Sequence, residues 1–110
     1  MSYQIGIKGA VQGDGAQTIT VPKSSYTKEK VGVVLHQVTI EPDGATVGTV
    51  AIEWLPWGSS TYEELKDNMG NAIVASLTRA ESYSFTANAA AIKCTPAGAD
   101  GTYNILCSGW

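Results

Sequence analysis

Apolar and polar residues alternate along most of the chain, in short runs separated by Gly, Asn, Asp and Pro. Successive side chains of a strand point to opposite faces of a sheet, so a period of two over four to eight residues indicates a half-buried strand. In the first such run, Tyr3, Ile5 and Ile7 share one face. The pattern predicts strands over residues 3–9, 17–21, 31–41, 45–55, 72–77, 82–87, 91–95 and 101–108.

The turn-forming residues set the expected connections. Pro42-Asp43-Gly44 is typical of a tight turn, so residues 31–41 and 45–55 are expected to form a long antiparallel hairpin. Residues 23–30 are polar and irregular, which favours a surface loop, and residues 12–15 form a turn cluster.

Residues 61–68 fit two structures. Ser60 with Glu63, or Thr61 with Glu64, has the spacing of a capping box that opens one short helical turn. The alternation from Tyr62 equally fits an edge strand.

About eight strands with turns every 8–12 residues or so are typical of sandwiches, jelly rolls and barrels. The sequence therefore predicts an all-β fold: a single antiparallel β-sandwich, jelly-roll-like, of about eight strands with at most one short helical turn. The length of 110 residues fits one domain over residues 1–110.

The last two predicted strands contain both cysteines. If Asp100-Gly101 is a two-residue turn, Cys94 lies directly opposite Cys107 in a pair whose Cβ atoms are close enough for a disulfide. The same register puts Cys94, Tyr103, Ile105 and Cys107 on one face, as a core stripe. A turn built on residues 96–98 would shift this register. The N-terminus lacks the basic and long apolar regions of a secretion signal, so two buried reduced thiols are favoured over a disulfide.

The charge of the chain limits which partners it can bind. Charged residues are 15% of the chain and the formal net charge is -3, below the usual fraction of about 25%. The basic residues are scattered, which argues against nucleic-acid binding, and no apolar run is long enough to span a membrane. Much of the surface is then neutral, which either eases burial against a partner or is only a common property of small β-domains.

The sequence contains no common catalytic or metal-binding pattern. His36 is the single histidine, lies in an apolar run and is expected to be a solvent-facing or hydrogen-bonded core residue. Glu63 and Glu64 are adjacent, so they point to different faces and form a poor acid–base pair. We therefore expect no enzyme, no cofactor, no metal and no small-molecule substrate.

The aromatic residues allow two interpretations. Trp54, Trp57 and Tyr62 form either an exposed ledge for a sugar or another subunit, or core and sandwich-mouth filling. Trp110, at the end of the sequence, either packs against the sheet or contacts a neighbouring subunit.

Residues 46–110 resemble small β-sandwich proteins encoded among the structural genes of tailed bacteriophages. The similar segments are W-L-P-W-G-S-S, Y-E-E-L-K-D-N-M-G-N-A-I, S-Y-S-F-T-A-N, A-A-I-K-C-T-P-A-G and G-T-Y-N-I-L-C-S-G-W. In length, low charge and expected fold the chain is similar to capsid decoration, or cement, proteins of these phages.

This resemblance implies a structural protein on the capsid surface of a virion, assembled in the host cytoplasm. Its partners would be the major capsid protein and itself, as a dimer or trimer. The expected interface residues lie on an edge strand, on the central loop and at the end of the sequence: Tyr3, Ile5, Trp57, Tyr62 and Trp110. The alternatives are a tail, neck or fibre-associated component of the same particle, and a carbohydrate-binding module.

Overall fold

The fold consists almost entirely of strands. A computed structural model describes residues 3–22 and 34–110, and the loop predicted over residues 23–30 lies outside them. The only helical element in the described part of the chain is a single 3-10 turn inside the predicted turn cluster. The elements are β1 (Tyr3–Ala10), the 3-10 turn η1 (Gln12–Asp14), β2 (Gln17–Thr20), β3 (Val34–Pro56), β4 (Glu63–Glu64), β5 (Val74–Ser76), β6 (Glu81–Ala87) and β7 (Ala89–Gly109).

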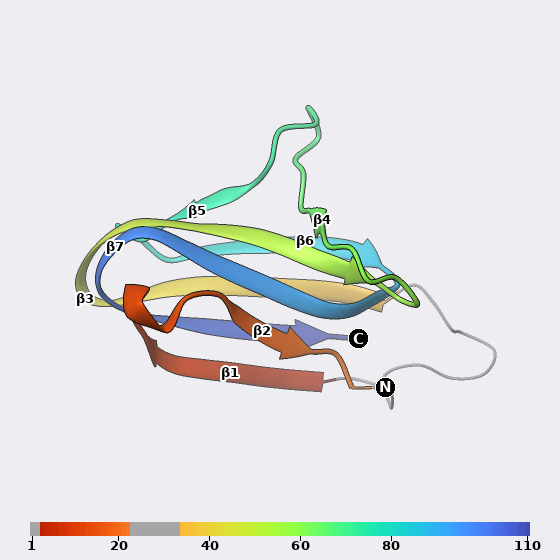
Figure 1. The fold of residues 1–110 in the computed structure, drawn as a ribbon, viewed down its shortest axis with the longest axis horizontal. Helices are drawn as coiled ribbons and strands as arrows, with labels where there is room; N and C mark the ends of the chain where they lie inside the picture. Colours follow the sequence, from red (N-terminus) through yellow and green to blue (C-terminus); the bar gives the residue numbers. More distant parts are fainter. Residues whose placement is uncertain (1–2, 23–33) are drawn as a thin grey trace.

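The two longest strands, β3 and β7, form the frame of the molecule. They pair antiparallel from His36 opposite Gly109 to Pro56 opposite Ala89, with bulges near the middle. Both curve round at one end of the molecule, so each strand runs through one layer and then through the other (Figure 1). The predicted strands over residues 91–95 and 101–108 are therefore the two halves of β7.

The bend produces two packed sheets. The first sheet has the order β1, C-terminal half of β7, N-terminal half of β3, β6. The second has the order β2, N-terminal half of β7, C-terminal half of β3, then β4 and β5. Eight strands result if the two halves of β3 and of β7 are counted separately and β4 and β5 are taken as one interrupted strand. Numbered in this way along the chain, the strands have the orders 1-8-3-6 and 2-7-4-5, which are those of a jelly roll. The predicted all-β antiparallel sandwich is confirmed.

The hairpin predicted at Pro42-Asp43-Gly44 is wrong. The turn-forming residues lie where β3 and β7 bend together, so neither strand pairs with itself. Gly48 shows why glycine is required at this bend: its φ is +112°, and a Cβ there would lie 2.6 Å from the Gly98 carbonyl oxygen. Glycines at the bend let the two backbones come close while both change direction.

The Cys94–Cys107 pairing is also wrong, for the same reason. Cys94 lies opposite Ile52, and Cys107 lies opposite Val38. Both are buried and free, as expected for reduced thiols, and burial raises the pKa of the Cys107 thiol to about 12. The predicted inward stripe is correct, because the cysteines share the core with Tyr103, Ile105 and residues of both sheets.

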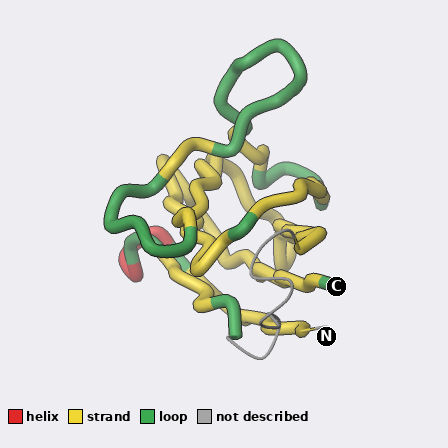
Figure 2. Tube along the Cα trace, turned by 90° about the vertical axis from the view of Figure 1, so that its right-hand side faces the viewer, coloured by secondary structure: helices red, strands yellow, loops and turns green. Residues whose placement is uncertain are grey.

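The ambiguous segment over residues 61–68 contains an edge strand and no helical turn. β4 pairs Glu64 with Glu53 and Glu63 with Trp54. The loop that follows β4 projects from the body of the molecule (Figure 2). At its tip Met69 is 86% exposed, and the Asp67 carboxylate accepts hydrogen bonds from the backbone N–H groups of Met69 and Asn71.

Candidate interaction surfaces

Tyr3 points into the sandwich and is 8% exposed, so its side chain does not present the outward interface expected of it. It lies in a row that crosses the first sheet, in which Tyr3 faces Gly109, Gly109 faces His36 and His36 faces Phe85. A Cβ at Gly109 would lie 2.2 Å from the Tyr3 ring. The missing side chain on β7 therefore lets the Tyr3 ring pass over the strand and reach His36 on β3.

His36 is fully buried, and both its ring nitrogens have partners. Nε2 donates to the Ala87 carbonyl oxygen at 3.1 Å, so Nδ1 accepts from the Tyr3 hydroxyl at 2.7 Å. Burial lowers the pKa of His36, although the hydrogen bond to Ala87 opposes this shift. The neutral imidazole thus links β1, β3 and β6 from the inside, as expected for a hydrogen-bonded core histidine.

Ile5 also packs against the core, so the outward surface of β1 is formed by other residues. In the described part of the chain β1 pairs only with β7, which confirms that it is an edge strand. β1 therefore presents neither the Tyr3 nor the Ile5 side chain on its outward surface.

The expected aromatic ledge does not form as one platform. Trp54 packs against the core with its ring 6.3 Å from that of Phe85. Tyr62 lies on the outer face of the second sheet, where the Lys93 ammonium is 4.3 Å from its ring centre. Trp57 is 48% exposed, beside a hollow lined by Thr20, Val21, Gly58 and Ala90.

The outer face of the first sheet is almost free of charge. Strand alternation and the paired registers place residues from β1, β7, β3 and β6 side by side on it. Lys8, Glu41 and Asp43, its three charged residues, lie at the end nearest the bend, and the remainder is Gln, Ser, Thr, Asn, Gly, Leu and Trp. This neutral face comprises Gln4, Gly6, Lys8, Leu35, Gln37, Thr39, Glu41, Asp43, Ser82, Ser84, Thr86, Thr102, Asn104, Leu106, Ser108 and Trp110.

Exposed apolar side chains gather on the neutral face. Leu35 is 36% exposed, Leu106 38% and Trp110 58%. Trp110 is held in place, because its backbone N–H donates to the Leu35 carbonyl oxygen and its own carbonyl oxygen accepts from the Leu35 N–H. The backbone that carries this large aromatic side chain is thus held in position before any partner binds, which lowers part of the entropy cost of binding.

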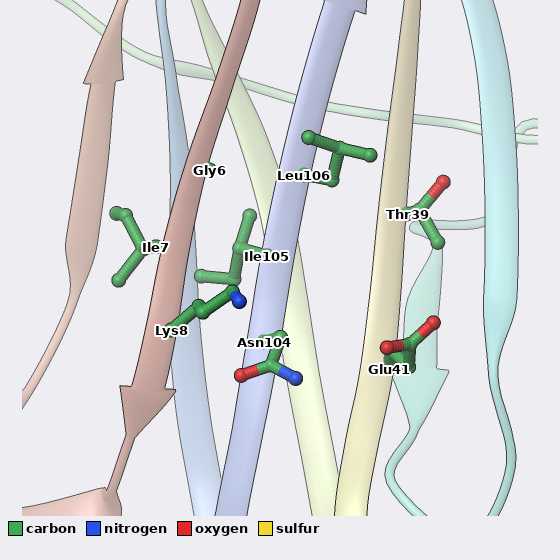
Figure 3. A pocket seen from close by; sticks show the side chains of 8 residues that line it. All are labelled: Gly6, Ile7, Lys8, Thr39, Glu41, Asn104, Ile105 and Leu106. Atoms are coloured by element: carbon green, nitrogen blue, oxygen red, sulfur yellow. The ribbon is translucent and has the colours of Figure 1, made fainter.

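A hollow of about 180 Å³ lies on the same face, between Lys8 on β1 and Glu41 on β3 (Figure 3). It exists because Gly6 has no side chain, and Leu106 and Thr39 stand beside it. We call it the Gly6 hollow. It is smaller than the roughly 300–1,000 Å³ of sites for drug-sized ligands, so it fits a single side chain better than a small molecule.

Of the five residues predicted to form an interface, Trp110 alone lies on the neutral face, which also includes Leu35, Leu106 and Gly6, three residues outside the prediction. A signal for Leu106 was present: it is the one apolar residue on the polar side of the strand that buries Tyr103, Ile105 and Cys107.

Known proteins give little further guidance. No family model and no curated protein matches the chain. It is similar to a solved chain from Bacillus endospore appendages, which form a family of disulfide-linked pili, with 16% identity, a TM-score of 0.47, and coverage of 100% of this chain and 84% of that chain. A likeness this remote indicates no function.

Metal-binding clusters and long apolar helices are both absent from the described residues. Within residues 3–22 and 34–110, no three His, Cys, Asp or Glu side chains come together as a metal site. The same residues form no helix of the length and hydropathy needed to cross a membrane.

Proposed function

We propose that this protein is a structural subunit that attaches to a large protein assembly through its neutral face, and that it acts without catalysis. The neutral face is the observation that carries the proposal. A broad sheet surface without charge at its centre loses little hydration energy when it is covered, and its exposed Leu and Trp residues gain from burial.

We further propose that the assembly is the capsid of a tailed bacteriophage and that the chain is a decoration, or cement, protein on its outer surface. The support is the resemblance of residues 46–110, together with the jelly-roll fold. The major capsid protein would then be the main partner. A subunit that binds only the assembled shell stabilises that shell by its binding free energy.

Quantitative mass spectrometry of purified particles tests this assignment. A copy number comparable to that of the major shell protein is expected. A few copies per particle would point instead to the tail or neck, and absence from the particle would overturn the virion assignment.

A charge placed on the neutral face tests the surface. Leu106→Glu should weaken binding to undecorated particles at least about tenfold, because the added carboxylate would be buried without a partner. Thr18→Glu is the matched control, since Thr18 is exposed on the second sheet and lies opposite Lys93. Equal binding by both variants and the unmodified protein would show that the neutral face is not the attachment surface.

A carbohydrate-binding role is the second candidate, and it rests on Trp57. Its exposed ring stands beside a hollow of about 320 Å³, and an aromatic face is a common platform for sugars. Quenching of tryptophan fluorescence by a panel of host glycans, lost in Trp57→Ala, would favour this function. No response would exclude it for those glycans.

A further inference from the structure

We infer that the neutral face also binds a second copy of the same chain, in a two-fold symmetric contact that seats Trp110 of each copy in the Gly6 hollow of the other. The inference rests on the proposed function, because it names a second partner for the same surface. Since a face buried in the dimer cannot also contact the assembly, the two partners compete, and the dimer is the form of the unattached subunit. It adds a specific contact and a specific geometry.

Each copy carries both halves of the contact. Trp110, directly after β7 and paired with Leu35, lies at one end of the neutral face, and Leu106, on β7 beside the Gly6 hollow, lies toward the other end. Ser108 lies midway, two residues from each. A two-fold axis that lies in the plane of contact and crosses the strands at Ser108 therefore places the indole of each copy over the partner's hollow. The same rotation forms both contacts.

The residues between the two sites suit a contact between identical surfaces. A two-fold contact brings each central charge close to its own copy, so a charged centre would repel itself. The residues that lie along the axis, one from each strand, are uncharged: Gln4, Ser108, Gln37 and Ser84. Their amides and hydroxyls can each donate and accept hydrogen bonds. Lys8 and Glu41 line the hollow itself, at the end of the face away from the axis.

The size of the face sets the expected strength. Four strands about 4.8 Å apart and eight residues rising about 3.3 Å each give roughly 500 Å² per copy. Two copies would bury about 1,000 Å², near the lower limit for specific association. The dimer is therefore expected to be weak and concentration-dependent, with a dissociation constant in about the micromolar range.

Sedimentation velocity over a concentration series tests the contact with three variants. Trp110→Ala removes the projecting side chain and retains the backbone hydrogen bonds to Leu35. Gly6→Val fills the hollow, and its Cβ would make only ordinary contacts, at 3.6 Å, with the Ile105 carbonyl oxygen and Leu106 Cδ1. Urea unfolding checks that the variant remains folded. Each should raise the dimer dissociation constant at least about tenfold. Trp57→Ala, an exposed tryptophan away from the face, should leave it unchanged.

Mixing the two face variants gives the decisive result. Trp110→Ala keeps its hollow and Gly6→Val keeps its indole, so the mixed dimer regains one of the two contacts. The mixed pair should associate more tightly than either variant alone. A monomer at all concentrations, a dimer insensitive to both variants, or a mixture no tighter than its components would overturn the inference.

The same variants separate this inference from the proposed function. If Trp110→Ala loses particle binding while the unmodified protein never dimerises, the face binds the assembly and not a second copy. If the dimer behaves as described and no particle binds, the self-contact holds and the capsid assignment fails.

Discussion

The two sheets of the sandwich carry their side-chain links on different sides. On the second sheet, the Lys93 ammonium lies 3.7 Å from the Glu53 carboxylate and 4.3 Å from the Tyr62 ring centre, so the chain covers this face with its own side chains. The first sheet is linked on its inner side through Tyr3 and His36, and its outer face is neutral. The comparison shows that the first sheet has its aromatic–histidine link on the inner side and polar contacts such as Thr39–Ser82 on the outer face, where the exposed Leu and Trp side chains remain available for binding.

The largest expected loss of stability comes from disrupting the link between Tyr3 and His36 on the inner side of the first sheet. Gly109→Ala places a methyl group within 2.2 Å of the Tyr3 ring and should destabilise the fold by about 3 kcal/mol, because the ring must leave its position over β7. Urea unfolding gives the free energy. Gly6→Ala is the control on the outer face of the same sheet, where the new methyl makes only ordinary contacts. Equal costs would refute the contrast between the inner and outer sides.

Removing one atom of the link should have a smaller effect. Tyr3→Phe leaves the ring in place but removes the hydroxyl that donates to His36. A buried Nδ1 without a donor should cost about 1–3 kcal/mol in the free energy of unfolding. A change below about 0.5 kcal/mol would show that the hydrogen bond does not contribute to holding β1.

The link should also respond to pH. Burial lowers the pKa of His36 below 6.5, so the unfolded chain binds a proton at a higher pH than the folded chain does. Stability from this group is therefore fully present above about pH 6.5 and is lost as the pH falls through the folded pKa. His36→Gln should flatten the stability–pH profile in this window. Glu81, whose pKa is also lowered, titrates below 4.5 and affects a separate range.

The smallest effect is expected on the covered face. Lys93→Met removes the ion pair with Glu53 and the contact with Tyr62, and the partly exposed pair should contribute about 1 kcal/mol or less. The loss should shrink further at high salt, because mobile ions screen the pair. A cost above that of Tyr3→Phe would reverse the comparison and make the outer link of the second sheet the stronger one.

The strands were largely predictable because their side-chain alternation is local. Tyr103, Ile105 and Cys107 face the core as the pattern predicted, even though the proposed pairing with Cys94 was wrong. The turn residues were recognised, but Pro42-Asp43-Gly44 cannot specify whether a strand reverses or bends beside a partner. That choice depends on β7, far along the chain, whose own glycine at position 98 meets Gly48 at the bend.

The candidate site was less predictable than the fold. Of the aromatic residues predicted to form an interface, Trp110 is exposed on the neutral face. Tyr3, predicted from its place on an edge strand, points inward, and this position depends on the absence of a side chain at Gly109 in a neighbouring strand. The local sequence does not mark Gly6 as part of a hollow, because its position beside Leu106 follows only from the pairing of β1 with β7.

The long β3–β7 pair has a consequence for how the chain reaches its native state. Both sheets are built on these two strands, and their partners come from distant parts of the sequence. Few native contacts can form before the distant strands meet, so folding is expected to be slow for a chain of this size. Until then, sheet edges that are paired in the finished molecule remain open to other chains, which makes the newly synthesised protein most prone to aggregation early in folding.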